Sequence, residues 1–327
     1  MTPSDSSEKS YIRRLSPEKQ AANKNAMLAN EQELIFMSPI LTGFSLQAKL
    51  WLRFYVDDIK PLKWNDEAYS HLVYPEEQKD LVLTFVKNHQ RMKAKGDGVD
   101  DVIHGKGQGL ILLLSGPPGT GKTLTAEAVA DKTRRPLYYL QAEELGTNAA
   151  YLGPKIKKVF EMATDWNAVI LLDEADVFMA ERSPADIARN ELVSIFLREL
   201  EYFQGIIFLT TNLYSTIDTA FRSRVNIHLL FSPLSASSRL VLWRKFLTRL
   251  PPRSVDSDVF ENALDHLSED DMHQLALWEL NGREIKNAIK TVRTWCLLKD
   301  YDIRLSRLES GIRVTAPQAI KGEWTVV

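Results

Sequence analysis

The stretch Leu110-Ile-Leu-Leu-Leu-Ser-Gly-Pro-Pro-Gly-Thr-Gly-Lys-Thr123 decides the fold. It begins as an apolar run, passes through a glycine-rich turn with the spacing G-x-x-x-x-G-K-T, and continues into a helical pattern. In such a turn the glycines let the backbone curl so that its N–H groups point at phosphate oxygens, and the start of the helix adds a favourable dipole. The stretch therefore predicts a strand, a phosphate-binding loop and a helix, and a site for ATP or GTP.

The loop and the first turn of its helix supply the residues that we expect to bind the nucleotide. Lys122 is expected to reach the β- and γ-phosphates, and Thr123 to offer its hydroxyl to Mg²⁺. A chance glycine-rich turn is the alternative, but the apolar run before it and the helical pattern after it argue against chance. The expected nucleotide-binding residues of this segment are Gly116, Pro117, Pro118, Gly119, Thr120, Gly121, Lys122, Thr123 and Leu124.

Two acidic residues follow the apolar run Val169-Ile-Leu-Leu172. Asp173 and Glu174 come at the C-terminal end of this predicted strand, which is the edge at which α/β sheets bind ligands. We expect Asp173 to hold Mg²⁺ through water and Glu174 to polarise the attacking water as a base. Acidic residues that complement a helix start are the alternative, but the phosphate-binding loop upstream favours a metal-dependent site.

A third polar group ends the next predicted strand, which reads Leu209-Thr-Thr-Asn212. Asn212 could position the water beside Glu174 and sense the γ-phosphate, and an asparagine in a turn is the alternative. The run Asp173-Glu-Ala-Asp176 also spells the signature of one helicase class. Those helicases place Ser-Ala-Thr on the next strand, where this chain has Thr-Thr-Asn, so the sequence departs from that class.

Apolar runs alternate with helical patterns from Val99 to about Phe231. Near-continuous apolar strands separated by helices indicate a parallel sheet that is covered on both faces. The strands are expected at Leu110–Leu114, Leu137–Leu140, Val169–Leu172, Ile206–Leu209 and Val225–Phe231. The helices are expected near Lys122–Lys132, Pro154–Trp166 and Ala185–Phe203. We therefore predict an α/β fold with a three-layer core around a parallel five-stranded sheet, followed from Ser232 by a small all-helical lid domain.

The composition limits the classes of protein that the chain can belong to. Its 327 residues are 44% hydrophobic and 26% charged, which is typical of a globular protein. The net charge of -2 excludes a strongly basic surface for nucleic acid or membranes over the chain as a whole. Cys296 is the only cysteine, so neither an internal disulfide nor a cysteine zinc site is possible, and the histidines lack metal-ligand spacing.

The apolar runs also bear on the compartment. None approaches the ~20 residues that span a bilayer, and the polar N-terminus lacks the apolar core of a signal peptide. We therefore expect an intracellular, cytoplasmic protein with no membrane span.

Taken together, these motifs resemble those of AAA ATPases, in the AAA+ P-loop superfamily. The resemblance covers about Val99 to Lys299 and is closest to a group abundant in filamentous fungi, in which an AAA core follows a long region of unknown function. Residues 34–95 resemble the end of that region, which implies a short relative or a fragment. The matching segments are Asp101–Gly109, Gly116–Glu127, Ala168–Phe178, Arg189–Tyr202, Gly205–Asn212 and Asp218–Arg224.

The residue patterns and the resemblance together divide the chain into five expected segments. Residues 1–33 are expected to be a flexible N-terminal segment, and residues 34–96 a remnant of the upstream region with short strands at Leu34–Phe36 and Leu50–Val56 and a helix after Pro75. Residues 97–231 would form the AAA core, 232–300 the helical lid, and 301–327 a C-terminal tail.

Further site residues are implied by the resemblance alone. Arg222 and Arg224 stand where AAA proteins carry the arginine fingers that reach the ATP of a neighbouring subunit. Their spacing is one residue shorter than usual, which leaves the choice between them open; Arg224 is favoured. Arg283, at the start of the last lid helix, would sense the γ-phosphate from the lid, whereas many AAA members have Ala there. Val102 and Ile103 match the segment that cups adenine.

The segment Tyr151-Leu152-Gly153 has the composition of the loop with which AAA rings grip a polypeptide. It lies closer to the following Phe160 than the usual pattern allows. It could therefore be a pore loop, or its side chains could pack a helix.

The resemblance implies an ATPase that converts ATP to ADP and phosphate with Mg²⁺, coupled to protein remodelling in a homo-oligomeric, hexameric ring. One alternative is a module that binds ATP and assembles with partners but hydrolyses little. The other is a nucleic-acid-dependent ATPase, against which the near-neutral charge argues.

Overall fold

The computed structural model describes residues 17–28, 38–95, 107–213, 217–250 and 266–322. The chain falls into two compact units, Met1–Leu62 and Lys63–Val327, and each is described by itself. The predicted strand at residues 34–36 lies outside the described residues.

The first unit contains a helix and a two-stranded antiparallel sheet. In the segment expected to be flexible, the described part is helix α2 (Pro17–Leu28), which opens on a proline and continues with Lys, Gln, Ala and Met, residues compatible with a helix. Strands β1 (Ile40–Ser45) and β2 (Leu50–Tyr55) form a hairpin and are followed by the 3₁₀ turn η1 (Val56–Asp58).

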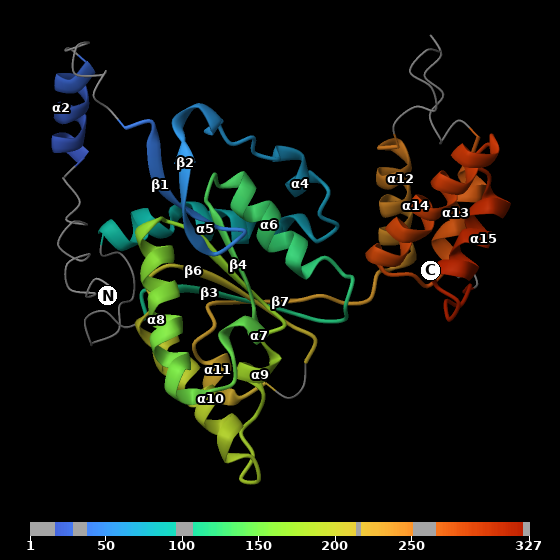
Figure 1. Cartoon of the computed structure of the whole chain (residues 1–327). Helices are drawn as coiled ribbons and strands as arrows, with labels where there is room; N and C mark the ends of the chain where they lie inside the picture. The colour runs from blue at the N-terminus through green and yellow to red at the C-terminus, as the bar shows by residue number, and fades with distance from the viewer. Residues whose placement is uncertain (1–16, 29–37, 96–106, 214–216, 251–265, 323–327) are drawn as a thin grey trace. The chain divides into compact units, whose positions relative to one another are not determined.

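The second unit contains a five-stranded parallel sheet with the order β4-β5-β6-β3-β7. The strands are β3 (Leu110–Ser115), β4 (Leu137–Gln141), β5 (Val169–Asp173), β6 (Ile206–Thr211) and β7 (Ile227–Leu230). Figure 1 shows this sheet at the centre of the unit, with helices on both of its faces. The predicted fold class, an α/β core around a five-stranded parallel sheet with a helical domain after it, is confirmed.

Helices connect and cover the strands because every residue of β3 and β6 is buried, so both faces of the sheet need apolar partners. The helices of this part are α4 (Asp66–Ser70), α5 (Glu76–Lys95), α6 (Lys122–Lys132), α7 (Ala142–Leu145), α8 (Ala149–Asp165), α9 (Asp176–Met179), α10 (Ile187–Tyr202) and α11 (Thr219–Arg222). On one face Leu112 and Leu114 pack with residues of α5 and α6. Elsewhere in the core the ring of Phe196 stacks with those of Phe178 and Phe221.

Helix α5 differs from the expected division of the chain. The sequence grouped it with the hairpin in residues 34–96, but it falls in the second unit together with α4. Its side chains Val82 and Val86 are 1% and 0% exposed and belong to the cluster around β3. The expected boundary between residues 96 and 97 lies outside the described residues.

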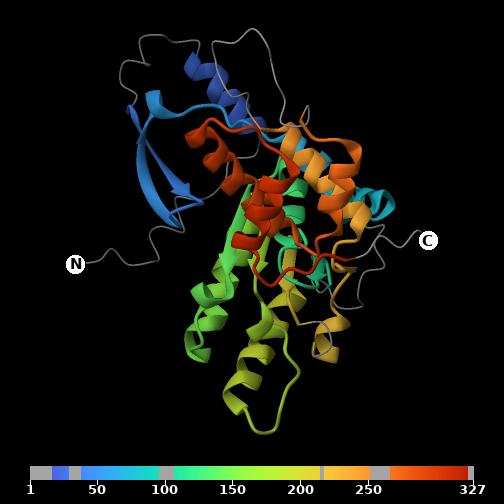
Figure 2. The ribbon, with the colours of Figure 1, turned by 90° about the vertical axis from the view of Figure 1, so that its right-hand side faces the viewer.

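A helical domain follows the sheet, and both views show its helices, coloured orange to red, as one group (Figure 1, Figure 2). Its members are α12 (Ala236–Thr248), α13 (Glu269–Leu277), α14 (Gly282–Lys299) and α15 (Leu305–Thr315). Trp243, Ile289 and Cys296 lie in its buried core.

The last of these helices comes from the residues that we expected to form a separate tail. Leu308 and Ile312 of α15 are fully buried in the lid core. Gly311 faces α14 so closely that an added Cβ would lie 2.2 Å from a methyl of Val292. The lid therefore continues beyond residue 300 and includes α15. No helix in the described ranges is both long enough and apolar enough to cross a membrane.

We predict that Leu308→Ala destabilises the lid by about 2–5 kcal/mol, because it removes a fully buried side chain and leaves a cavity. Val314→Ala is the matched control on the same helix, since Val314 is 75% exposed, and should change the stability by about 0.5 kcal/mol or less. Urea unfolding monitored by circular dichroism and tryptophan fluorescence measures both. Equal effects of the two substitutions would contradict the packing of α15 into the lid.

Candidate active site

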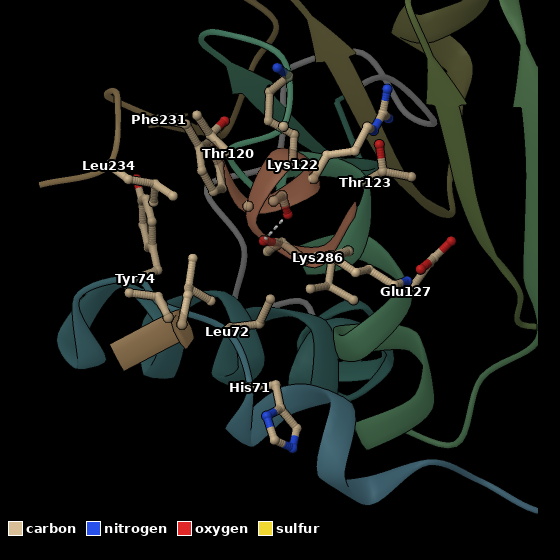
Figure 3. Close-up of a pocket in the computed structure, with 18 of the residues that line it drawn as sticks. His71, Leu72, Tyr74, Thr120, Lys122, Thr123, Glu127, Phe231, Leu234 and Lys286 are labelled. Carbon is tan, nitrogen blue, oxygen red and sulfur yellow. Dashed lines mark hydrogen bonds between the residues drawn. The ribbon is translucent and has the colours of Figure 1, made fainter. Parts of the chain in front are cut away.

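Most of the residues predicted to bind nucleotide, namely Pro118 to Leu124 and Arg283, line a pocket of about 500 Å³ within the second unit, whereas Gly116 and Pro117 are not among its lining residues. Side chains reach it from the loop before α6, from the ends of β5 and β6, from lid helices α12 and α14, and from the link between α4 and α5. Figure 3 shows labelled members of these groups around the pocket, among them Lys122, Thr123, Tyr74 and Lys286. The pocket thus joins segments that are far apart in the sequence.

The loop between β3 and α6 depends on glycine at two close approaches. Gly116 has φ +141°, and a Cβ there would lie 2.1 Å from the carbonyl oxygen of Phe231. Gly119 has φ +74°, and its Cβ would lie 2.5 Å from the side-chain oxygen of Asn281. A side chain at either position would collide with the residue after β7 or with the lid, so the loop keeps this shape only with glycine.

Lys122, at the start of α6, folds back across this loop. Its ammonium group donates hydrogen bonds to the carbonyl oxygens of Gly116 (2.7 Å) and Pro117 (2.8 Å) and to Oδ1 of Asn212 (3.0 Å). Burial lowers the pKa of Lys122, and the nearby carboxylate of Asp173 opposes this shift. The positive charge is therefore held at the base of the pocket, beside the end of β6.

Asp173 ends β5 and is surrounded by hydroxyl groups. Thr123 Oγ1 lies 3.3 Å from both of its carboxylate oxygens, Tyr139 donates to Oδ2 at 3.2 Å, and the hydroxyl of Thr210 donates to Oδ1. Burial raises the pKa of the Tyr139 phenol, so this group is protonated at neutral pH and can donate. Gln141 in turn donates to the Tyr139 hydroxyl at 3.2 Å.

A hydroxyl and a carboxylate are hard oxygen donors, and this donor set fits Mg²⁺. Mg²⁺ is bound in proteins through one or two such groups together with substrate phosphates, rather than by a cage of side chains. Thr123 and Asp173 are therefore the pair that suits a magnesium ion.

Glu174 directly follows Asp173 and has an exposed side chain. Its backbone adopts φ +54°, a left-handed conformation that is uncommon outside glycine and costs about 1–2 kcal/mol. The N–H of Glu174 donates to Thr210 Oγ1 at 3.0 Å, which supports this turn. The strained turn directs the chain away from the sheet at the point where Glu174 lines the pocket.

The lid closes one side of the pocket through the N-terminus of α14. Gly282 donates its N–H to the carbonyl oxygen of Gly119 at 3.0 Å. Asn281 caps the helix by accepting from the N–H groups of Arg283 and Glu284, both at 3.0 Å. Arg283, which the resemblance assigned to the nucleotide, lines the pocket, and so does Lys286 one turn later.

The structure brings some of the predicted site residues together in the pocket and leaves others outside it. Lys122, Thr123, Asp173, Glu174, Asn212 and Arg283 all line the pocket. Arg222 and Arg224 do not. Arg224 donates to the carbonyl oxygen of Ala220 at 2.7 Å and lies 3.7 Å from Glu201, whereas the side chain of Arg222 is exposed. Val102 and Ile103 lie outside the described residues.

The sequence did not identify the apolar wall of the pocket. It comes from Leu72, Val73 and Tyr74 between α4 and α5, and from Phe231, Leu234, Leu242 and Phe246. Tyr74 is held in place by a hydrogen bond to the carbonyl oxygen of Leu230 (3.1 Å) and by its ring contact with Phe231 at 4.5 Å. The sequence feature that could have identified this wall is the apolar run Leu72-Val-Tyr74 directly before Pro75.

Glu127 is a second residue that the sequence motifs did not single out. It lies one turn beyond Thr123 on α6 and lines the pocket. Burial, with smaller contributions from Asp173 and Asp131, raises the pKa of its carboxyl group. The sequence feature that could have identified Glu127 is its position four residues after Thr123, because residues four apart share a helix face.

The segment Tyr151-Leu152-Gly153 lies in the first turns of α8. Tyr151 is 73% exposed, whereas Leu152 is fully buried. Gly153 is also buried and faces Ile195 of α10 at a distance that allows ordinary contact. Helix packing therefore accounts for Leu152 and Gly153, and it leaves the aromatic ring of Tyr151 on the surface.

Comparison with known proteins gives one family and several relatives. Residues 112–233 match the family described as ATPase family associated with various cellular activities (AAA). The ATP-dependent zinc metalloprotease YME1L1 of Mus musculus is 30% identical over 173 residues, which cover 50% of this chain and 23% of that protein. A putative 26S proteasome regulatory subunit homolog of Methanothermobacter marburgensis is 26% identical over 204 residues, 60% of this chain and 52% of that protein.

Spastin of Gallus gallus is 25% identical over 228 residues, which cover 64% of this chain and 37% of that protein. The chain thus spans between 23% and 52% of the length of these three relatives. The match with the family begins inside β3 and ends just after β7, so it contains the phosphate-binding loop, Asp173, Glu174 and Asn212. Residues 112–233 are therefore an AAA ATPase domain of the AAA+ superfamily, built on the ATP-binding fold of P-loop NTPases.

Proposed function

We propose that this chain hydrolyses ATP to ADP and phosphate with the help of Mg²⁺. The observation that carries the proposal is the convergence of Lys122, Thr123, Asp173, Glu174 and Asn212 in one pocket, from separate elements of the sheet and its helices. Each of these groups suits one requirement of phosphoryl transfer, namely charge neutralisation, metal binding, activation of water and positioning.

The roles follow from the chemistry of the side chains. The N–H groups of the loop 116–123 and the ammonium group of Lys122 would bind the phosphates. Thr123 and Asp173 would hold Mg²⁺, which neutralises charge on the phosphates when bound. Glu174 would accept a proton from water as the water oxygen bonds to the γ-phosphorus. The bond from that phosphorus to the bridging oxygen then breaks, and the electron pair leaves with ADP.

We further propose that the base binds against the apolar wall formed by Leu72, Val73 and Tyr74 with Phe231. Leu72 and Phe231 are fixed by packing, since they are 5% and 3% exposed, and Tyr74 is held by its contacts with Leu230 and Phe231. The wall would therefore provide a preformed apolar surface. Val102 and Ile103, to which the resemblance gives contacts with adenine, lie outside the described residues, and we keep them as further proposed contacts to the base.

We predict that Glu174→Gln binds ATP as the wild type does but hydrolyses it at least about 10²-fold more slowly, because the amide cannot accept the proton from water. Isothermal calorimetry measures the binding and phosphate release measures the rate. Glu181→Gln is the control, since it removes a neighbouring exposed carboxylate that does not line the pocket. Unchanged hydrolysis by Glu174→Gln would remove Glu174 from the mechanism.

We also propose that the active form is a homo-oligomer, and by analogy a hexameric ring, in which Arg222 or Arg224 reaches the nucleotide of a neighbouring copy. Neither arginine lines the pocket of its own chain, which is what such a role requires. The resemblance to AAA proteins led us to favour Arg224. The geometry favours Arg222, because Arg224 already contacts the carbonyl oxygen of Ala220 and the carboxylate of Glu201.

In a protein dilution series, we predict that the ATPase rate per chain rises with protein concentration. Replacing the finger by Ala should lower the rate by about 10³-fold or more without weakening ATP binding. Arg222→Ala and Arg224→Ala are controls for each other, since only one should have this effect. A flat, near-zero rate at all concentrations would instead favour a module that binds ATP and assembles, and stimulation by single-stranded DNA or RNA would favour a nucleic-acid-dependent ATPase.

The work done by such an assembly is proposed to be protein remodelling. Tyr151 supports this, because an exposed aromatic ring at the start of α8 could contact an extended polypeptide. The names of two relatives point the same way, one being a zinc metalloprotease and the other a proteasome regulatory subunit homolog. From the sequence motifs we also propose that the chain belongs to the filamentous-fungal group of AAA ATPases. We further propose that it acts in the cytoplasm.

A further inference from the structure

We propose that Tyr139 is a positioning residue for the metal site: its hydroxyl holds the Asp173 carboxylate in one orientation, and Gln141 orients that hydroxyl. The inference rests on the proposed role of Asp173 in holding Mg²⁺. Tyr139 has no counterpart among the motifs that led to the site, and it lies on β4, a strand that contributes none of the residues lining the pocket.

The register of the sheet explains how β4 reaches the site. Strand β4 is parallel to β5, with Tyr139 opposite Leu171 and Gln141 opposite Asp173. Tyr139 is thus a diagonal neighbour of Asp173, and an aromatic side chain is long enough to cross this distance when it leans along the strand. Its hydroxyl reaches Asp173 Oδ2 at 3.2 Å.

Gln141 completes a short chain of hydrogen bonds. Its Nε2 donates to the Tyr139 hydroxyl at 3.2 Å, so that oxygen accepts from Gln141 while its proton is directed at Asp173. A hydroxyl can rotate about its C–O bond, and a donor on one side favours the rotamer that points the proton to the other. Gln141 therefore selects the orientation in which Tyr139 donates to Asp173.

The two strands next to β5 hold the two oxygens of the same carboxylate. The hydroxyl of Thr210 on β6 donates to Oδ1, and that of Tyr139 on β4 donates to Oδ2. Thr123 reaches both oxygens at 3.3 Å, but its hydroxyl is the other group expected to hold Mg²⁺. Tyr139 is therefore the group that restrains Oδ2 whether or not Thr123 turns to a metal ion.

The hydroxyl can be tested apart from the ring. The Tyr139 ring packs against the buried cluster around β3, and phenylalanine keeps that packing. The 3.2 Å between the Tyr139 hydroxyl and Asp173 Oδ2 is longer than most O–H···O hydrogen bonds, so the loss of this contact should have a modest effect. We expect the free Mg²⁺ concentration that half-saturates binding of a fluorescent ATP analogue to rise about 3- to 10-fold in Tyr139→Phe.

The experiment titrates Mg²⁺ into each protein at a fixed concentration of the ATP analogue, with the full chain. Binding of the analogue in EDTA should be unchanged in Tyr139→Phe, since the phosphate-binding loop keeps its contacts. Gln141→Leu should shift the Mg²⁺ titration in the same direction by a smaller factor. Tyr138→Phe is the matched control, because neighbouring residues of a strand point to opposite faces of the sheet, and it should leave the titration unchanged.

The outcomes separate this inference from the proposed function. If the wild type shows no effect of Mg²⁺ on binding of the analogue, the proposed role of Asp173 fails. If the wild type responds to Mg²⁺ but Tyr139→Phe matches it within twofold, the positioning role of Tyr139 is overturned. Equal shifts in Tyr138→Phe and Tyr139→Phe would also overturn it. If Tyr139→Phe fails to fold, the titration of Gln141→Leu decides, since the Gln141 side chain is exposed, and an unshifted curve would overturn the role.

Discussion

The site depends on the hydrogen bonds that the ammonium group of Lys122 donates. A positive charge that is only 8% exposed is costly unless oxygen atoms surround it, and here the turn of the loop and Asn212 at the end of β6 provide them. These contacts require the carbonyl oxygens of Gly116 and Pro117 to point inwards, which leaves the loop in a curled shape. The buried charge therefore couples the shape of the loop to the position of β6, and it places a cation next to Asp173.

The same loop links the core to the lid. The carbonyl oxygen of Gly119 accepts from the N–H of Gly282, and the capping side chain of Asn281 lies so close to Gly119 that an added Cβ would be 2.5 Å from its Oδ1. A ligand that moves the phosphate-binding loop would therefore act directly on the N-terminus of α14, without a relay through other residues. The helix that carries Arg283 thus contacts the loop that is proposed to bind the phosphates, which explains how residues of a separate helical domain come to line the pocket.

The confirmed prediction of the fold class rests on local patterns, and so does the prediction of the residues that line the pocket. Five apolar runs predicted the strands, and Lys122, Asp173 and Asn212 follow strand-like segments closely, where a parallel sheet gathers polar groups at one edge. Tyr139 could not be found in this way, because its contact with Asp173 depends on the register between β4 and β5. The packing of α15 into the lid could not be predicted either, because it depends on the contacts of Leu308 and Gly311 with the rest of the lid core, which includes α14.

The sequence by itself determined the strand, loop and helix around Lys122, because glycines, an apolar run and a helical period act over a few residues. It likewise determined the parallel α/β class and the chemistry of the residues proposed to bind nucleotide and Mg²⁺. Only the tertiary structure decided the apolar wall around Tyr74, the contacts that set Arg224 apart from Arg222, and the hydroxyl groups around Asp173. Most of these features join residues that lie far apart in the chain, and only packing of the whole sheet brings such residues within reach of one another.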